Sequence, residues 1–306
     1  MQDFNNNNFI KNWWRGIDQP AIIALAILIS FSLMLVTTTS SAVAEKIGLT
    51  DNYFSSRQVI YLFIATTLVI AFSSLNRKWI KRIGILGFCF NIAMLFLVKF
   101  YGYEIKGATR WIRIIGFSCQ PSEFIKPFFC IVTGWVLSLK YEEEFPSFRV
   151  CACLYGLVAA LLIIQPDFGM LVLVTAVFGV QLFIAGLPLV WIMIAKIGGL
   201  LGIISAYLLL PHVAARINNF LDPESNENYQ VTKSILAFEH GGLYGRGPGE
   251  GLVKQHLPDS HTDFIFAVAG EEFGAIICIM LICVFAFIVL RTLIRLGDEN
   301  NKFVQL

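Results

Sequence analysis

The residues best placed to do chemistry lie in residues 257–274, LPDSHTDFIFAVAGEEFG, where a long polar loop turns into an apolar run. Asp263 stands at the start of that run, and Glu271 and Glu272 follow two helical turns deeper. An acidic side chain at the depth of lipid hydrocarbon costs about 3 kcal/mol, so residues of this kind usually mark a functional site. This segment is therefore predicted to hold a working carboxylate.

The residues alone leave two interpretations of Asp263 open. It can react with a substrate, or it can cap the following helix by accepting hydrogen bonds from free N–H groups. Glu271 lies eight residues on, about 80° around a helix and about 12 Å along it, which is too far for a direct acid/base pair. Glu272 falls on the opposite side of the helix and is predicted to make a structural pair with a neighbouring helix.

Three further groups of residues are candidates for chemistry. Glu123 and Lys126 are three residues apart and share a helix face, where they form an internal ion pair or let Lys126 meet a lipid phosphate. Arg110 and Trp111 supply a cation and an interfacial aromatic at the outer headgroup level. Asp167 competes with Asp263 as the reacting carboxylate, although its place between proline and glycine favours capping of the next helix.

Other kinds of site are not indicated by the sequence. The seven cysteines and four histidines show no metal-ligand spacing, although a divalent cation at the acidic segment stays open. The glycine-rich stretch GGLYGRGPGEG lacks the lysine and the strand-to-helix context of a phosphate-binding loop. A net charge of +2, with basic residues spread over the loops, gives no sign of nucleic-acid binding. Lys196, within an apolar run, receives no role.

The composition identifies the surroundings of these residues. With 57% hydrophobic residues, 14% charged residues and a mean hydropathy of +0.70, the chain is too apolar for an ordinary soluble domain. Runs of about 20 apolar residues predict transmembrane helices. We therefore expect an all-α polytopic membrane protein with about eight spans, at residues 21–40, 59–75, 83–100, 124–139, 150–164, 171–186, 189–209 and 264–290.

The fifth and sixth spans are separated by residues 165–169, QPDFG. They could form one kinked helix, but about 37 residues are too many for a single crossing, so two spans are favoured. Basic residues gather in the second connection, at residues 77–82, and this bias places both termini in the cytoplasm. The loops at about 101–122 and 211–262 then lie outside. The glycines of the second loop predict a structured fold-back near the membrane.

Several short motifs together resemble the SEDS family of cell-division and cell-shape membrane proteins. They occur in the family's order over roughly residues 13–295, and the set is specific although no single motif is decisive. Trp13-Trp14 and residues 42–49 are most similar to the division member of the family. The motifs are Gly107-Ala108-Thr109-Arg110-Trp111-Ile112, Gln120-Pro121-Ser122-Glu123 with Lys126, Gln165-Pro166-Asp167-Phe168-Gly169, Leu257-Pro258, His261-Thr262-Asp263-Phe264-Ile265-Phe266, and Glu271-Glu272 with Gly274.

The resemblance implies a peptidoglycan glycosyltransferase that polymerises lipid II, the undecaprenyl-pyrophosphate disaccharide pentapeptide, at the division septum of the bacterial inner membrane. It implies a class B penicillin-binding protein and other division proteins as partners. In the family, the aspartate matching Asp263 is the catalytic carboxylate, which suits a general base for the attacking sugar hydroxyl. The expected substrate-binding residues are Arg110, Trp111, Lys126, Arg246, His261 and Thr262, supported by Glu123, Asp167 and Glu271.

The resemblance also implies ten spans, whereas this sequence contains eight within a single SEDS-type membrane domain over residues 1–306. We therefore expect a chain that is C-terminally incomplete relative to the family. Two alternatives to the polymerase follow from the residues and the length. The many spans, buried charges and broken helix also suit a lipid II transporter. A shortened chain also suits a non-catalytic scaffold for cell division.

Overall fold

The computed structural model describes residues 11, 13–48, 50, 52–105, 108–114, 117–141, 145–209, 211, 213, 214, 218, 226–257 and 259–306. The chain divides into two compact units. The first unit comprises Met1–Ser74 and Ile203–Ile294, and the second comprises Leu75–Gly202 and Arg295–Leu306. The single membrane domain expected from the sequence stays a prediction.

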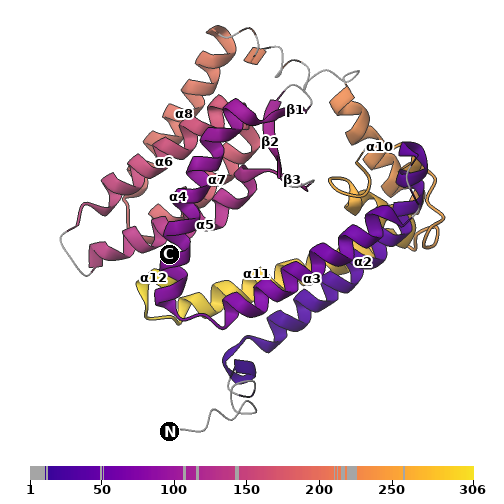
Figure 1. Ribbon diagram of the computed structural model, residues 1–306, viewed down its shortest axis with the longest axis horizontal. Helices are drawn as coiled ribbons and strands as arrows, with labels where there is room; N and C mark the ends of the chain where they lie inside the picture. The colour runs from indigo at the N-terminus through magenta and orange to yellow at the C-terminus, as the bar shows by residue number, and fades with distance from the viewer. Residues whose placement is uncertain are drawn as a thin grey trace. The chain divides into compact units, whose positions relative to one another are not determined.

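Apolar helices build most of the second unit (Figure 1). Helix α4 begins at Asn76, whose side chain accepts a hydrogen bond from the N–H of Trp79, and α5 begins with Pro121, which suits the first turn of a helix. Short helices η1 and α12 complete the unit, and α8 follows α7 in the chain. The bounds are α4 Arg77–Tyr101, α5 Pro121–Ser138, η1 Leu139–Tyr141, α6 Ser147–Ile164, α7 Phe168–Ile184, α8 Leu189–Leu209 and α12 Lys302–Gln305.

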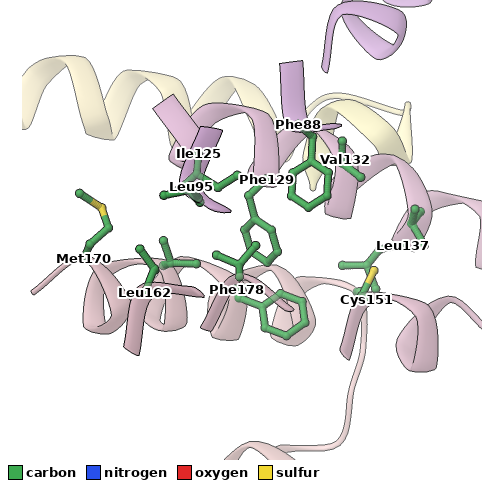
Figure 2. Packing of buried hydrophobic residues seen from close by; sticks show 14 residues of the cluster. Phe88, Leu95, Ile125, Phe129, Val132, Leu137, Cys151, Leu162, Met170 and Phe178 are labelled. Carbon is green, nitrogen blue, oxygen red and sulfur yellow. The ribbon is translucent and has the colours of Figure 1, made fainter. Parts of the chain in front are cut away.

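The core of the second unit lies where α4, α5, α6 and α7 meet (Figure 2). Phe129 of α5 is 1% exposed, and its ring lies 6.4 Å from that of Phe88 and 5.6 Å from that of Phe178. Helix α4 packs closely on α5 because Gly87 faces Phe128, where a Cβ atom would come within 2.3 Å of the ring. This packing gives the second unit a closely packed apolar core.

A small antiparallel sheet occupies the loop between α4 and α5. Its strands are β1 Tyr103–Ile105, β2 Ala108–Ile114 and β3 Phe117–Cys119, in the order β1-β2-β3. The Tyr103 hydroxyl donates to Ser118 Oγ at 2.7 Å across the sheet. The helices confirm the predicted all-α membrane fold, and this small sheet is an addition that the sequence did not indicate. Strand β2 carries Arg110 and Trp111, so the sheet determines where both side chains project.

The first unit is built around α2, Gln19–Ile47, which packs on both α3, Tyr53–Ser73, and α11, Ile265–Gly297 (Figure 1). Gln58 of α3 donates to Ser32 Oγ of α2 at 3.0 Å. Leu35 of α2 packs in one buried cluster with Cys278 and Leu281 of α11. The long loop between α8 and α11 contributes α10, Asn226–Gly241, and the single turn η2, Val253–Gln255.

A helix coincides with each of the eight predicted spans, and α6 and α7 are separate, which confirms the choice of two spans. Within the described residues, six helices are long and apolar enough to cross a membrane, while α7 and the apolar part Ile197–Leu209 of α8 are shorter. Helix α10 was not predicted. Residues 222–223, an Asp-Pro pair typical of a turn, and the polar asparagine run at residues 5–8 lie outside the described residues.

Candidate active site

Helix α11 is broken at Gly274, where the backbone has φ 80° and ψ 175°. A break in a helix leaves N–H and C=O groups without their usual partners, which is costly in an apolar environment. Loop residues 242–247 fill this gap with their own backbone. The N–H groups of Arg246 and Gly247 donate to the carbonyls of Glu271 and Glu272 at 3.0 and 2.9 Å. In return, the carbonyls of residues 242 and 243 accept from residues 275 and 276 at 2.9 and 3.3 Å.

Glu271 and Glu272 hold the same loop through their side chains. Glu271 is fully buried, and its carboxylate accepts from the N–H groups of residues 252, 253 and 254 at 2.7, 2.8 and 3.1 Å. Glu272 Oε1 lies 2.5 Å from Nζ of Lys254, with 0% and 4% of the two side chains exposed. The predicted partner for Glu272, a neighbouring helix, was wrong, since the cation comes from the loop at η2. The predicted loop is structured over residues 226–257, and its place near the membrane stays a prediction.

Asp263 lies two residues before α11, and its side chain is exposed. Within the described part of the chain, its carboxylate takes part in no hydrogen bond or ion pair with a protein group. The alternative role as a helix cap therefore finds no support. Glu271 and Glu272 bond the helix that follows Asp263 to the loop. The exposed carboxylate of Asp263 therefore stands at the start of a helix that is held in place.

Beside Asp263, His261 and Thr262 complete the predicted motif. The His261 ring packs against Phe54 of α3 with ring centroids 4.2 Å apart, and its Nδ1 atom is buried without a partner in the described structure. Burial lowers the pKa of His261, and the nearby carboxylates of Asp259 and Asp263 oppose that shift. The Thr262 hydroxyl is occupied by a turn, donating to the Asp259 carbonyl at 3.2 Å.

A second polar cluster lies in the other unit around Asp167, which is 4% exposed. Arg110 approaches its carboxylate at 3.5 Å, and Ser122 and Gln120 donate to Oδ2 at 3.1 and 3.4 Å. Asp167 also caps α7 by accepting from the N–H of Met170, which confirms the predicted cap. Three motifs far apart in the sequence, from β2, the start of α5 and the α6–α7 break, thus meet at one carboxylate.

The remaining candidates have simpler surroundings. Lys126 and Glu123 form the predicted i,i+3 ion pair at 2.6 Å, with 29% and 52% of the side chains exposed, so Lys126 still faces outward. Trp111 is partly buried on β2. Arg246 is exposed, although its Nε donates to the His240 carbonyl at 3.1 Å. The side chain of Lys196 lies outside the described residues.

Sequence reasoning missed Lys254, Gln120 and the contact of Ser122 with Asp167. Lys254 is one of several basic residues in the long loop, and no local pattern shows that a loop lysine is buried. Gln120 and Ser122 belong to one of the family motifs, so the sequence marked both positions. It did not show that both side chains bond to Asp167. Within the described residues, no three His, Cys, Asp or Glu side chains gather into a metal site, and the divalent cation stays untested.

Comparison with known proteins decides the family. The model of the FtsW, RodA and SpoVE family, described as "Cell cycle protein", matches residues 19–306. The chain belongs to this family. The SEDS resemblance drawn from its motifs is thereby confirmed, and so is the polytopic membrane fold that the resemblance implied.

Relatives of this SEDS chain include two proteins named "Probable peptidoglycan glycosyltransferase FtsW". The protein of Caulobacter vibrioides is 39% identical over 297 residues, covering 96% of this chain and 76% of the relative. That of Saccharophagus degradans is 32% identical over 304 residues, covering 95% and 78%. Both matches cover nearly the whole SEDS chain.

Solved structures share the fold of the SEDS chain at lower identity. One belongs to a peptidoglycan synthase complex described by its coordination of polymerization and crosslinking, with a TM-score of 0.73, 22% identity and coverage of 94% of this chain and 80% of that one. Another is the rod shape determining protein RodA of Thermus thermophilus, with a TM-score of 0.64, 20% identity and coverage of 95% and 80%.

Proposed function

We propose that this protein is a peptidoglycan glycosyltransferase that polymerises lipid II into glycan strands during septal cell-wall synthesis. Family membership and the names of the relatives support the reaction class. The observation that carries the assignment is Asp263, an exposed carboxylate with no protein partner in the described structure, at the start of a helix whose other acids are buried and bonded. The transporter and scaffold alternatives are not favoured by these relatives.

The proposed chemistry is a displacement at the anomeric carbon of one lipid II molecule. Asp263 takes the proton from the 4-hydroxyl of the acceptor sugar, the hydroxyl oxygen forms the new glycosidic bond, and undecaprenyl pyrophosphate leaves with the electron pair of the broken bond. A free, exposed carboxylate can reach a sugar hydroxyl, whereas Glu271 and Glu272 are committed to the loop. Asp263 is therefore the base, and the two glutamates support it.

Cations are proposed to bind the departing pyrophosphate. Lys126 and Arg246 remain partly or wholly exposed, so their positive charges are available to an anionic lipid. Arg110 donates to the carbonyls of Gln165 and Pro166 and contacts Asp167. Its contribution to substrate binding is therefore smaller than the sequence suggested. A divalent cation, if used, would take oxygen ligands from the pyrophosphate as well as from protein.

The proposed setting is the bacterial inner membrane at the division septum, with both termini in the cytoplasm and the two large loops outside. The multiple apolar helices show a multi-pass membrane protein. A class B penicillin-binding protein is the proposed partner, because a solved relative of the fold belongs to a peptidoglycan synthase complex. Such a partner would crosslink the strands that this chain polymerises.

The test is lipid II polymerisation by the purified chain together with its penicillin-binding partner. Asp263→Ala removes the base and is expected to lower the rate by about 100-fold or more. Glu239→Gln, which changes an exposed carboxylate on α10, is the control and should keep the wild-type rate. Full polymerase activity in Asp263→Ala would refute the assignment of the base, and lipid scrambling that survives Asp263→Asn without polymerisation would favour a transporter.

A further inference from the structure

Lys254, Glu271 and Glu272 form a buried trio, here called the loop clamp, that is separate from the proposed reacting carboxylate of Asp263. The Lys254 ammonium donates to Glu272 at 2.5 Å, to the Gly249 carbonyl at 2.8 Å and to the Thr38 carbonyl of α2 at 3.1 Å. These three acceptors use all three of its N–H bonds. One side chain thus ties together the loop, the helix that follows Asp263, and α2.

We propose that Lys254 and Glu272 are positioning residues for Asp263. This inference rests on the proposed function and extends it, since neither residue touches the reacting atoms. The segment between Asp263 and the break, residues 265–273, is a short half-helix whose direction is independent of the rest of α11 once the helical hydrogen bonds stop at Gly274. A short half-helix needs other contacts to fix its direction, and the loop clamp supplies them.

The backbone around the clamp leaves little room for another arrangement. A Cβ atom on Gly245 would come within 2.3 Å of the Glu272 carbonyl, and one on Gly241 within 1.9 Å of the Gly270 carbonyl. The same half-helix is therefore held both by close backbone contact with the loop and by the ion pair of Glu272 with Lys254. Both kinds of contact lie about two helical turns from Asp263.

The buried charges indicate a role beyond stability. A buried ion pair is seldom more stabilising than apolar residues of the same volume, because both charges lose their hydration. What such a pair supplies is direction, since each hydrogen bond of the ammonium has a defined acceptor. Displacement of a reacting group by about 1 Å can cost about 100-fold in rate, so a clamp that fixes the half-helix has a direct effect on turnover.

The experiment compares Lys254→Met, Glu272→Gln and the double variant Lys254→Met/Glu272→Gln in the polymerase assay with the partner present. Each single change is expected to lower kcat about 100-fold with KM changed by less than about threefold, because substrate contacts remain. Glu250→Gln, an exposed carboxylate in the same loop with no side-chain partner in the described structure, is the matched control. It should behave as wild type.

The double variant separates positioning from stability. It removes the uncompensated buried charge of either single variant, so its melting temperature should recover toward wild type. Its kcat should stay low, because the links to Thr38 and Gly249 are still missing. Recovery of kcat together with melting temperature would show that the clamp is only structural and would overturn the inference.

A milder change covers the case in which the single variants do not fold. Gly251→Ala keeps every charge but places a Cβ atom 2.8 Å from Glu271 Oε2, so it displaces the clamp. It should also lower kcat while KM is kept, and wild-type kcat in folded Gly251→Ala would again overturn the inference. A wild-type chain that fails to polymerise lipid II would instead refute the proposed function.

Discussion

His261 is the residue near Asp263 whose charge responds most directly to its surroundings. Its ring is half-buried against Phe54, and burial disfavours the imidazolium more than Asp259 and Asp263 favour it. The pKa in the folded protein therefore lies below the ordinary value of 6.5. The shift favours the neutral ring, which suits the proposed role of His261 as a hydrogen-bonding group for substrate.

This shift predicts a pH-dependent stability. A histidine whose pKa is lowered by folding contributes stability above pH 6.5, and that contribution is lost as the pH falls through the lower folded-state pKa. The melting temperature of the wild type should therefore drop in this acidic window. His261→Gln, which cannot be protonated there, should show a shallower drop when both proteins are melted across the same pH series. Parallel curves for the two proteins would contradict the assignment.

The guanidinium of Arg110 is already bound to protein groups. Its guanidinium bonds to two carbonyls at the end of α6 and pairs with Asp167, which is itself bonded to Ser122. These contacts fix strand β2 to the α6–α7 break and satisfy a buried carboxylate at the same time. The position of Trp111, the next residue on β2, follows from that anchor.

Among the elements, α11 is the one whose irregularity matters most. In a continuous helix from residue 265 to residue 297, the backbone N–H and C=O groups would bond to one another. None of them would then be available to the loop. The break at Gly274 instead leaves carbonyl and N–H groups free to form hydrogen bonds with loop residues 242–247. The loop and the half-helix after Asp263 therefore form one folded element, although they are separated in sequence.

Gly274→Ala should destabilise this element. The φ of 80° is strained for alanine, and the new Cβ would come within 2.4 Å of the backbone of residues 243 and 245. We expect a loss of about 1–3 kcal/mol and reduced polymerase activity. Gly297→Ala, later on the same helix with no atom within 4 Å of its Cβ position, is the control. Thermal unfolding of both proteins checks this, and equal melting temperatures would count against the break as drawn.

For the whole molecule, stability in a membrane depends on packing more than on removal of apolar surface from water. Lipid tails are as apolar as the protein interior, so helices gain mainly from close contact and hydrogen bonds. The second unit follows this rule, with Phe129 enclosed by aromatic rings and Gln165 donating to the Leu95 carbonyl at 2.7 Å. A cavity in this core is therefore expected to lower the free energy of unfolding.

Phe129→Ala tests this account of the core. It should cost roughly 2 kcal/mol, which is the cavity part of the usual penalty, because lipid replaces water as the reference for transfer. Phe183→Ala, on α7 with 55% of the residue exposed, leaves no cavity and should cost little. Unfolding of the two variants in a denaturing detergent measures the difference. Equal losses would show that Phe129 does not anchor the core.

The sequence by itself determined the helices, because runs of about 20 apolar residues have no other stable form in a bilayer. It also located Asp263, Asp167 and the Glu123–Lys126 pair, whose charges or spacing stand out against an apolar background. Its boundaries were less accurate. Helix α3, for example, begins at Tyr53 and not at residue 59, since polar residues can extend a helix beyond the hydrocarbon.

Only the tertiary structure decided which polar residues meet. Lys254 is buried against Glu272, and Asp167 gathers Arg110, Gln120 and Ser122, because folding brings together residues that are 18 to 57 positions apart. No local pattern encodes such partners, since each depends on the backbone path of another segment. The same holds for the break at Gly274, which is favourable only because a distant loop supplies the missing hydrogen bonds.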